Sequence, residues 1–177
     1  LYADTELVRE YVDSRGFLFN QDVNPLYNFG TNQNNWSSGA SRVTLKYSEK
    51  TTVIWKLDAD QYSRFIADGY APNTDAVAHN FITRDGYEDI LQAPTVVVIQ
   101  GPLYNDEATT LPSVLTVGVG PVTIFHEGKY IEGTWRRNDI SDPFEFLDTN
   151  QNKIDVPPSK QWIHLLPLNG EITISDN

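Results

Sequence analysis

The sequence contains no cysteine in its 177 residues, which excludes disulfides, a thiolate nucleophile and any metal site with sulfur ligands. Basic residues are scarce: 13 Lys and Arg stand against 24 Asp and Glu, so the formal net charge is −11. Nucleic-acid binding requires a basic surface that neutralises phosphates, and we therefore expect no nucleic-acid partner. The same charge argues against direct binding to an anionic membrane surface.

Methionine is also absent, and the chain begins at Leu1. We therefore expect a processed or trimmed piece of a longer protein, from which a targeting segment has been removed. No apolar run approaches the roughly 18 residues of a membrane-spanning helix, and no signal peptide is visible. What is present is a composition with 40% hydrophobic and 12% aromatic residues, which suits a globular, sheet-rich chain.

Strand periodicity is clearest between residues 118 and 137. Two apolar runs in this segment are separated by a turn that contains Gly128, and side chains of the second run alternate between two faces. Residues 95–100 form a continuous apolar, β-branched run, which predicts a central strand buried on both faces. Alternating apolar residues across 40–66 predict a meander of three strands.

Helix signals are strong only near the N-terminus. Residues 4–16 carry an apolar stripe and end at a glycine, which predicts a helix. Residues 20–41 are rich in Asn, Gly and Ser and predict a long surface loop from which aromatic side chains pack back onto the fold. Residues 85–92 are expected to form one or two helical turns.

The last predicted element is a β-hairpin. Asn169 and Gly170 form a strong two-residue turn signal between strands expected at 161–166 and 171–175. No internal repeat and no sharp boundary divides the chain. Together the patterns predict one domain, residues 1–177, with an α+β, β-rich fold of mostly antiparallel sheets packed in layers, an N-terminal helix and few other helices.

The three histidines, His79, His126 and His164, share no metal-ligand spacing. His126 lies beside Glu127 in a predicted turn, so we expect it to be solvated. His164 follows two apolar residues in a predicted strand, so we expect it to be partly buried and hydrogen-bonded. Neither a zinc site nor a Ser-His-Asp site is indicated by these positions.

Residues 148–152, Asp-Thr-Asn-Gln-Asn, place side-chain oxygens at alternate positions, as the start of a calcium loop does. An EF-hand loop then needs Gly at its sixth position and Glu at its twelfth, but Lys153 and Ser159 stand there. A turn rich in Asp and Asn explains the same residues. We therefore predict a turn and no metal or other cofactor, with a calcium-stabilised module as the alternative.

Arg64 is the residue whose environment is least expected from its type. It stands on a predicted strand between Tyr62 and Phe65, and a charge among aromatic residues requires water, a carboxylate or an anion. Asp75, in the following loop, is the natural candidate partner. One interpretation is a partly buried ion pair that pins this loop. The other is an arginine that faces a ligand in a cleft.

Trp135, Arg136 and Arg137 contain the only dibasic step of this acidic chain. With the other three tryptophans they are candidates for a platform on which sugars or peptides stack. Core tryptophans next to a basic strand end are the alternative. The 24 carboxylates would also allow a glycosidase-type acid pair, but nothing in the sequence singles out two of them.

Several short motifs resemble the C-terminal part of the YerB-like family, which consists of predicted bacterial lipoproteins of unknown function. Their order and spacing agree over most of the chain, and residues 118–167 carry the most specific part. The matching residues are Leu1-Tyr2-Ala3, Tyr62-Ser63-Arg64 with Asp75, Gly118 to Gly120, Glu127-Gly128-Lys129, Gly133-Thr134-Trp135-Arg136-Arg137, and Trp162-Ile163 before Pro167.

The resemblance implies an exported, extracellular protein of the cell envelope, held by a lipid anchor in an N-terminal region outside this chain. It implies a mixed fold and supplies no activity. Our first functional hypothesis is a non-catalytic domain that binds a protein or cell-wall partner through a cleft near Arg64 and Asp75. The alternative is a hydrolase or transferase acting on envelope polymers, which requires two carboxylates about 5–10 Å apart in a cleft.

Overall fold

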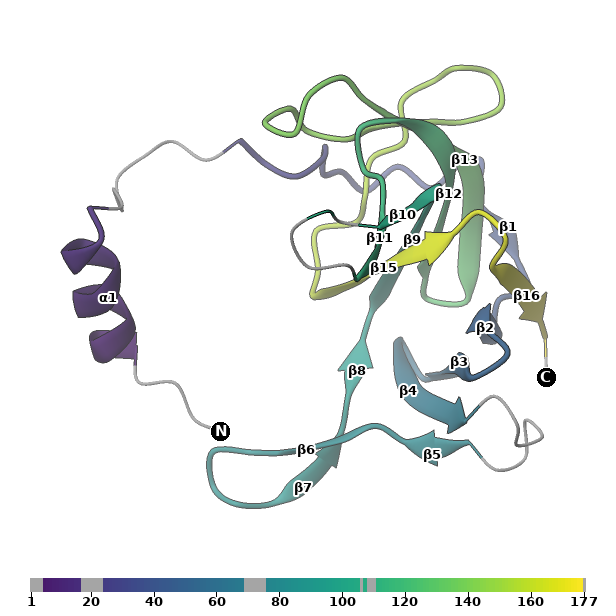
Figure 1. The fold of residues 1–177 in the computed structure, drawn as a ribbon. Coiled ribbons are helices and arrows are strands. Elements are labelled where there is room, and N and C mark those ends of the chain that lie inside the picture. Colours follow the sequence, from purple (N-terminus) through teal and green to yellow (C-terminus); the bar gives the residue numbers. More distant parts are fainter. Residues whose placement is uncertain (1–4, 17–23, 69–75, 106, 108–110, 177) are drawn as a thin grey trace.

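The computed structural model describes residues 5–16, 24–68, 76–105, 107 and 111–176, and Figure 1 shows their arrangement. This part of the chain contains one helix, α1 (Thr5–Ser14), and is otherwise built from strands. Nearly all strand pairs are antiparallel. The expectation of a β-rich, mostly antiparallel fold with an N-terminal helix is therefore confirmed.

The first sheet is built around the apolar strand at residues 95–101. Its strand order is β1-β13-β12-β9-β15, and β14 pairs with β13. Every pair is antiparallel except β9 with β15, which run parallel. The strands are β1 (Ser37–Ser38), β9 (Thr95–Gly101), β12 (Gly118–His126), β13 (Lys129–Arg137), β14 (Glu145–Leu147) and β15 (Gln161–Pro167).

The second sheet contains the predicted three-stranded meander, which is confirmed. Its order is β16-β2-β3-β4-β5, and β8 also pairs with β4. Two short ribbons, β6–β7 and β10–β11, form two-stranded sheets of their own. The strands are β2 (Arg42–Ser48), β3 (Thr51–Asp58), β4 (Gln61–Asp68), β5 (Val77–Ala78), β8 (Gln92–Ala93) and β16 (Glu171–Ser175); the ribbons are β6 (Asn80–Ile82), β7 (Glu88–Ile90), β10 (Leu103–Asn105) and β11 (Pro112–Val114).

Strand β9 contributes to two separate hydrophobic clusters. Val96 and Val98 pack with side chains of the second sheet, including Trp55 and Tyr62. The alternate residues of β9 pack on the opposite side, in a cluster with Tyr27 and residues that follow β13. Because successive side chains of a strand point to opposite faces, a strand that contacts both clusters must be apolar throughout. The prediction for residues 95–100 is confirmed.

The β12–β13 hairpin is the longest antiparallel pair, with register from Gly118 opposite Arg137 to His126 opposite Lys129. Glu127 and Gly128 both have positive φ angles, 48° and 77°, as a type I′ turn requires. The predicted turn at this place is confirmed. Gly118, Gly120 and Pro121 in the sequence predict a bulge or tight bend, and this prediction is wrong, because β12 runs unbroken from Gly118 to His126.

The predicted hairpin around Asn169 and Gly170 is wrong. β15 pairs with β9 in the first sheet, whereas β16 pairs with β2 in the second, so this connection crosses from one sheet to the other. Gly170 lacks the positive φ that the expected turn requires. Burial of Leu166 between the sheets therefore outweighs the local turn preference.

The structure also bears on the predictions for residues 85–92, for the loop before β1 and for the start of the N-terminal helix. Residues 85–92 form β7 and the start of β8 instead of helical turns. In the loop that precedes β1, Tyr27 is 1% exposed and Trp36 packs partly buried against the core, as predicted, whereas Phe29, which was also expected to pack back, is 49% exposed. Residue 4, where the predicted helix begins, lies outside the described residues.

Helix α1 does not bury its apolar stripe among the described residues. Leu7, Val8 and Tyr11 remain 64%, 49% and 58% exposed. Among the helices that the structure describes, none is both long and apolar enough to cross a membrane.

Candidate functional site

Arg64 lies on the face of β4 that is directed toward the first sheet. It shares this face with Tyr62, which is fully buried between the sheets, because residues two apart on a strand point the same way. Across the sheet Arg64 is paired with Trp55 of β3. The alternation of side chains along β4 therefore places the guanidinium of Arg64 on the same face as the aromatic residues Tyr62 and Trp55.

The guanidinium of Arg64 is held by rings instead of a carboxylate. Its carbon Cζ lies 4.9 Å from the ring centre of Trp162 and 6.0 Å from that of Trp55, within cation–π range. Nη1 is hydrogen-bonded to Nδ1 of His79. Nε is buried and has no hydrogen-bond partner among the described residues. Buried donors are nearly always paired in folded proteins, so this free N–H marks a position for an acceptor.

The charges around Arg64 do not compensate it. Burial lowers the pKa of Arg64, and the nearby hydroxyl of Tyr47 partly offsets this effect. Burial and the positive charge of Arg64 both lower the pKa of His79, so His79 stays neutral at pH 7. Within the described residues no carboxylate forms an ion pair with Arg64. Asp75, the predicted partner, lies outside the described residues.

A hydrogen-bonded network supports this region from β15. His164 is 4% exposed; its Nε2 accepts a hydrogen bond from the Trp55 indole at 2.8 Å, and its Nδ1 lies 2.6 Å from the Tyr47 hydroxyl. Indole N–H groups only donate, so Nε2 is unprotonated and Nδ1–H donates to Tyr47. The expectation of a buried, hydrogen-bonded His164 is confirmed.

Both titratable members of this network are neutral. Burial, assisted by the charge of Arg64, lowers the pKa of His164 to about 3. Burial raises the pKa of Tyr47 to about 12, although Arg64 acts in the opposite direction. The five aromatic and imidazole neighbours of Arg64 are thus uncharged at pH 7, and Arg64 carries the charge of this region. These neighbours are Tyr47, Trp55, His79, Trp162 and His164. A desolvated cation of this kind favours an anionic or carbonyl-bearing ligand.

A groove of about 430 Å³ adjoins the Arg64 cluster, by which we mean Arg64, Trp55, His79, Trp162 and His164. Trp162 belongs to both the cluster and the lining of the groove, so its ring connects the two. The other lining residues are mainly apolar: Phe81, Leu91, Gln92, Ala93, Lys160 and Gln161.

The β6–β7 ribbon forms one side of this groove. Phe81 and Ile82 on the ribbon are 45% and 57% exposed, and Tyr87 at its tip is 75% exposed. Lys160, which directly precedes β15, also lines the groove. The region thus offers an apolar surface with two cations, Lys160 and Arg64, at its margin.

The structure does not bring Trp135, Arg136 and Arg137 to the Arg64 cluster. Trp135 is 1% exposed in the other hydrophobic cluster and donates to the carbonyl of Gln100 at 2.7 Å. Arg136 pairs with Glu145 at 2.5 Å.

Arg137 is held in the same way by its own neighbourhood. It donates to the backbone carbonyls of Asp142 and Ile140 and lies 4.8 Å from the Phe144 ring centre. The ring of Trp135 also contacts Phe144 edge-on. These contacts favour an architectural role for the dibasic step over a stacking platform, and its part in binding stays a prediction.

His126 is buried instead of solvated, so that expectation is wrong. It is 8% exposed, and its Nδ1 lies 2.8 Å from the hydroxyl of Thr95 on the adjacent strand. His126 ends β12 before the turn begins, and its side chain lies beside β9. The position of His126 next to the Glu127–Gly128 turn therefore did not indicate that its side chain is exposed.

The turn at residues 148–152 is organised around the carboxylate of Asp148. Its Oδ1 accepts the backbone N–H groups of Asn150 and Asn152, both at 2.8 Å, and its Oδ2 accepts the Asn152 side chain at 3.1 Å. These bonds, with the side chain of Asn35, hold the pKa of Asp148 below its usual range. N–H groups directed at the carboxylate oppose a cation, so the geometry favours the turn over a calcium loop.

The hydrolase alternative finds little support in the same region. Asp148 and Asp155 line one pocket, and a glycosidase requires one carboxyl of raised pKa as its acid. The pKa of Asp148 is shifted in the opposite direction. Asp148 is therefore unsuited to be the protonated acid that the reaction needs.

Sequence reasoning identified Arg64 and missed the residues around it. His79 and Trp162 come from segments predicted as loop and as part of a C-terminal hairpin. The sequence signal for this neighbourhood was Trp162-Ile163-His164, because Trp162 and His164 lie two residues apart and therefore place two rings with hydrogen-bonding nitrogens on one face of the strand. Their position beside Arg64 follows only from the parallel pairing of β15 with β9.

Residues 43–163 match the family described as "Protein of unknown function (DUF3048) C-terminal domain". The chain belongs to this family. The resemblance of the sequence to YerB-like proteins is thereby confirmed. The Arg64 cluster, apart from His164, falls inside the matched part of this DUF3048 C-terminal domain.

A solved structure shows the same fold. The crystal structure of YerB protein from Bacillus subtilis superimposes with a TM-score of 0.66 at 15% sequence identity. The alignment covers 97% of this chain and 54% of the YerB chain, so the DUF3048 C-terminal domain described here spans about half the length of that protein. None of the curated proteins matches the chain.

Proposed function

We propose that this domain is a non-catalytic binding module that contacts its partner through Arg64 and the adjoining groove. The observation that carries the proposal is the state of Arg64: a half-buried guanidinium between two tryptophan rings, with a buried Nε–H that no described residue satisfies. An unpaired buried cation costs free energy, and such costs are typical of functional positions.

The surroundings of Arg64 favour a carboxylate next to an apolar group as the recognised feature. A carboxylate can accept hydrogen bonds from Nε and Nη of one guanidinium, while an apolar neighbour occupies the groove beside Trp162 and Phe81. The formal net charge of this domain, −11, repels densely anionic polymers. A protein segment with one acidic residue therefore suits the site better than a polyanionic cell-wall polymer.

We further propose that this module works outside the cell, in the envelope, and that the intact protein reaches the membrane only through a lipid anchor outside this chain. The support is the similarity to YerB-like predicted lipoproteins. A binding partner would then be another envelope protein or a cell-wall component. Nucleic acid is not expected at so acidic a surface.

The proposal is tested by capturing partners from envelope extract with the intact protein. Arg64→Gln removes the charge and should abolish capture, because no other donor replaces the guanidinium. Arg136→Gln is the matched control, since Arg136 is paired on another part of the surface. Circular dichroism and thermal melting establish that both variants are folded.

Two outcomes contradict the proposal. Equal capture by the wild type and Arg64→Gln removes Arg64 from the interface. Unfolding of Arg64→Gln, with Arg136→Gln folded, supports the interpretation that Arg64 is an internal pin of the structure.

A further inference from the structure

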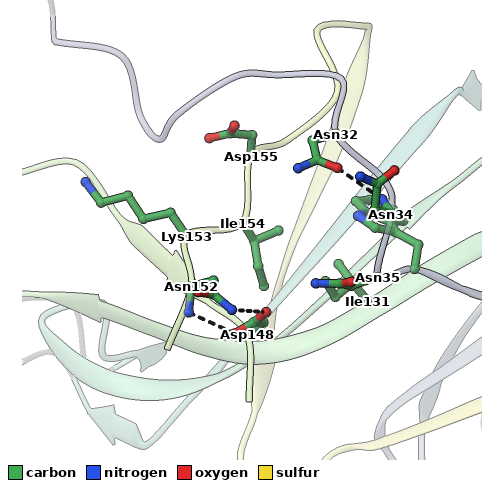
Figure 2. Close-up of a pocket in the computed structure, with 10 residues that line it drawn as sticks. Asn32, Asn34, Asn35, Ile131, Asp148, Asn152, Lys153, Ile154 and Asp155 are labelled. Atoms are coloured by element: carbon green, nitrogen blue, oxygen red, sulfur yellow. Dashed lines mark hydrogen bonds between the residues drawn. The ribbon is translucent and has the colours of Figure 1, made fainter. Parts of the chain in front are cut away.

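A second, polar pocket lies on the other side of the first sheet from Arg64. It has a volume of about 310 Å³ and is bounded by residues 32–36, which precede β1, and residues 148–155, which follow β14 (Figure 2). Ile131 and Ile154, which belong to the hydrophobic cluster on this face, lie between the two segments. Its size falls at the lower end of the usual range for ligand pockets, about 300–1,000 Å³.

The two walls of the pocket are fixed to each other by backbone contacts. Phe29 forms a parallel bridge with Val156, and the N–H of Gly30 donates to the carbonyl of Val156 at 3.1 Å. A Cβ on Gly30 would lie 2.6 Å from Oδ2 of Asp155, so only glycine permits this approach. The pocket is therefore preformed by the packing of two segments that are far apart in the sequence.

Side-chain hydrogen bonds also order the lining. Asp148, 7% exposed, is bonded to Asn152 of its own segment and to Asn35 of the opposite wall. On that wall the backbone N–H of Asn34 donates to Oδ1 of Asn32 at 3.1 Å. Figure 2 shows these amide side chains arranged around one space. Ordered side chains lose little entropy when a ligand binds.

The lining has the chemistry of a neutral ligand rich in hydroxyl groups. Each asparagine offers both donors and an acceptor, which matches hydroxyls that donate and accept in turn. Asp148 and Asp155 outnumber Lys153, the one cation of the lining, which also pairs with Glu145, so an anion is disfavoured. The N–H groups around Asp148 disfavour a cation. Trp36, partly buried against the core, supplies an apolar wall of the kind on which a sugar ring packs.

A neighbouring pocket extends this surface. It has a volume of about 290 Å³ and shares Asn35, Ile131 and Asp148 with the first pocket. Its remaining lining residues are again mostly polar: Ser37, Tyr130, Glu132, Thr149 and Asn150. Two adjoining pockets of similar size, with a common amide between them, suit two linked sugar rings.

We propose that these two pockets bind a neutral oligosaccharide, with one sugar ring in each pocket and Asn35 at the junction. This site is separate from Arg64 and does not depend on the function proposed there. It would give the domain a carbohydrate contact in addition to a protein contact.

The test is a titration of the ¹⁵N-labelled domain with three neutral disaccharides: cellobiose, maltose and N,N′-diacetylchitobiose. We expect saturable amide shifts in residues 32–37 and 148–155 with at least one of them. Asn35→Ala should weaken that binding about tenfold, as expected for one lost amide contact. Asn28→Ala, an exposed asparagine outside both pockets, should leave the affinity unchanged.

Asn35 also contacts Asp148, so its substitution could disturb the turn. Asn32→Ala provides a second variant on an exposed side chain and should also weaken binding. Saturable shifts that survive both Asn32→Ala and Asn35→Ala contradict the proposal. So does the absence of saturable shifts with all three sugars up to their solubility limits.

Discussion

Acidification should destabilise the folded domain through His164 before its carboxylates titrate. The imidazole is buried between the sheets and accepts the Trp55 indole N–H on the nitrogen that a second proton would occupy. A charged imidazolium there would lose this hydrogen bond and lie near the cation of Arg64. These causes, burial first, lower the pKa of His164 from 6.5 to about 3.

The magnitude follows from this shift. Between about pH 6.5 and pH 3 the unfolded chain binds a proton at this position that the folded chain does not, so stability falls as the pH falls. Each pH unit corresponds to about 1.4 kcal/mol, so acidification from pH 7 to pH 5 should cost about 2 kcal/mol from His164 alone. The lowered pKa of His79 acts in the same direction.

The assay is urea denaturation of the wild type and His164→Gln at pH 7, 6 and 5. A glutamine can accept from Trp55 and donate to Tyr47, but it does not titrate. We expect the variant to be less stable at pH 7 and to lose about 2 kcal/mol less than the wild type between pH 7 and pH 5. Equal losses in the two proteins would refute the assigned tautomer and the buried neutral imidazole.

Three other predictions concern packing and the turn at Asp148. Gly120→Ala places a Cβ 2.4 Å from the carbonyl of Gln100 and should lower the free energy of unfolding by about 2–4 kcal/mol in urea denaturation. The control Val119→Thr, at a position 69% exposed, should lower it by less than about 1 kcal/mol, and equal losses would contradict the close contact at Gly120. Asp148→Ala should lower the melting temperature at pH 7. The difference in melting temperature between the wild type and this variant should shrink as the pH falls below about 4, because a carboxylate with a lowered pKa stabilises the fold only while it is ionised. A difference that stays constant with pH would show that the charge of Asp148 is irrelevant to stability. EDTA should leave the melting temperature unchanged, and a decrease would restore the calcium interpretation of residues 148–152.

Patterns that depend on one strand and its nearest partner could be read from the sequence. The apolar run of β9 predicts burial on both faces, and the turn at Glu127–Gly128 predicts the β12–β13 hairpin. The meander of β2, β3 and β4 follows from alternation with short turns. In each case local preference and tertiary packing favour the same structure.

The connection after β15 was mispredicted because these two influences disagree. Asn169 and Gly170 favour a hairpin locally, but β15 gains seven residue pairs with β9 and β16 gains five with β2. No local signal indicates that consecutive strands join different sheets. The prediction that His126 is solvated was wrong for a related reason, since its burial comes from contact with Thr95 on another strand.

The candidate site was predictable only in part. Arg64 was conspicuous as a charge among aromatic residues, whereas its neighbours Trp162 and His79 were not, because they approach it through long-range pairing. The polar pockets above the first sheet also depend on contacts between distant segments. Single residues of unusual type were therefore visible in the sequence, but the groups they form were not.

The central claim is that the surface beside Arg64 is occupied by a partner, and crosslinking in living cells tests it most directly. A photo-reactive amino acid is placed at position 81, where Phe81 is 45% exposed beside the groove, and separately at position 104, where Tyr104 is 46% exposed elsewhere. The account predicts one discrete adduct from position 81 that is absent from position 104 and is lost when Arg64→Gln is added. Identical adducts from both positions, or an adduct that persists with Arg64→Gln, would contradict it.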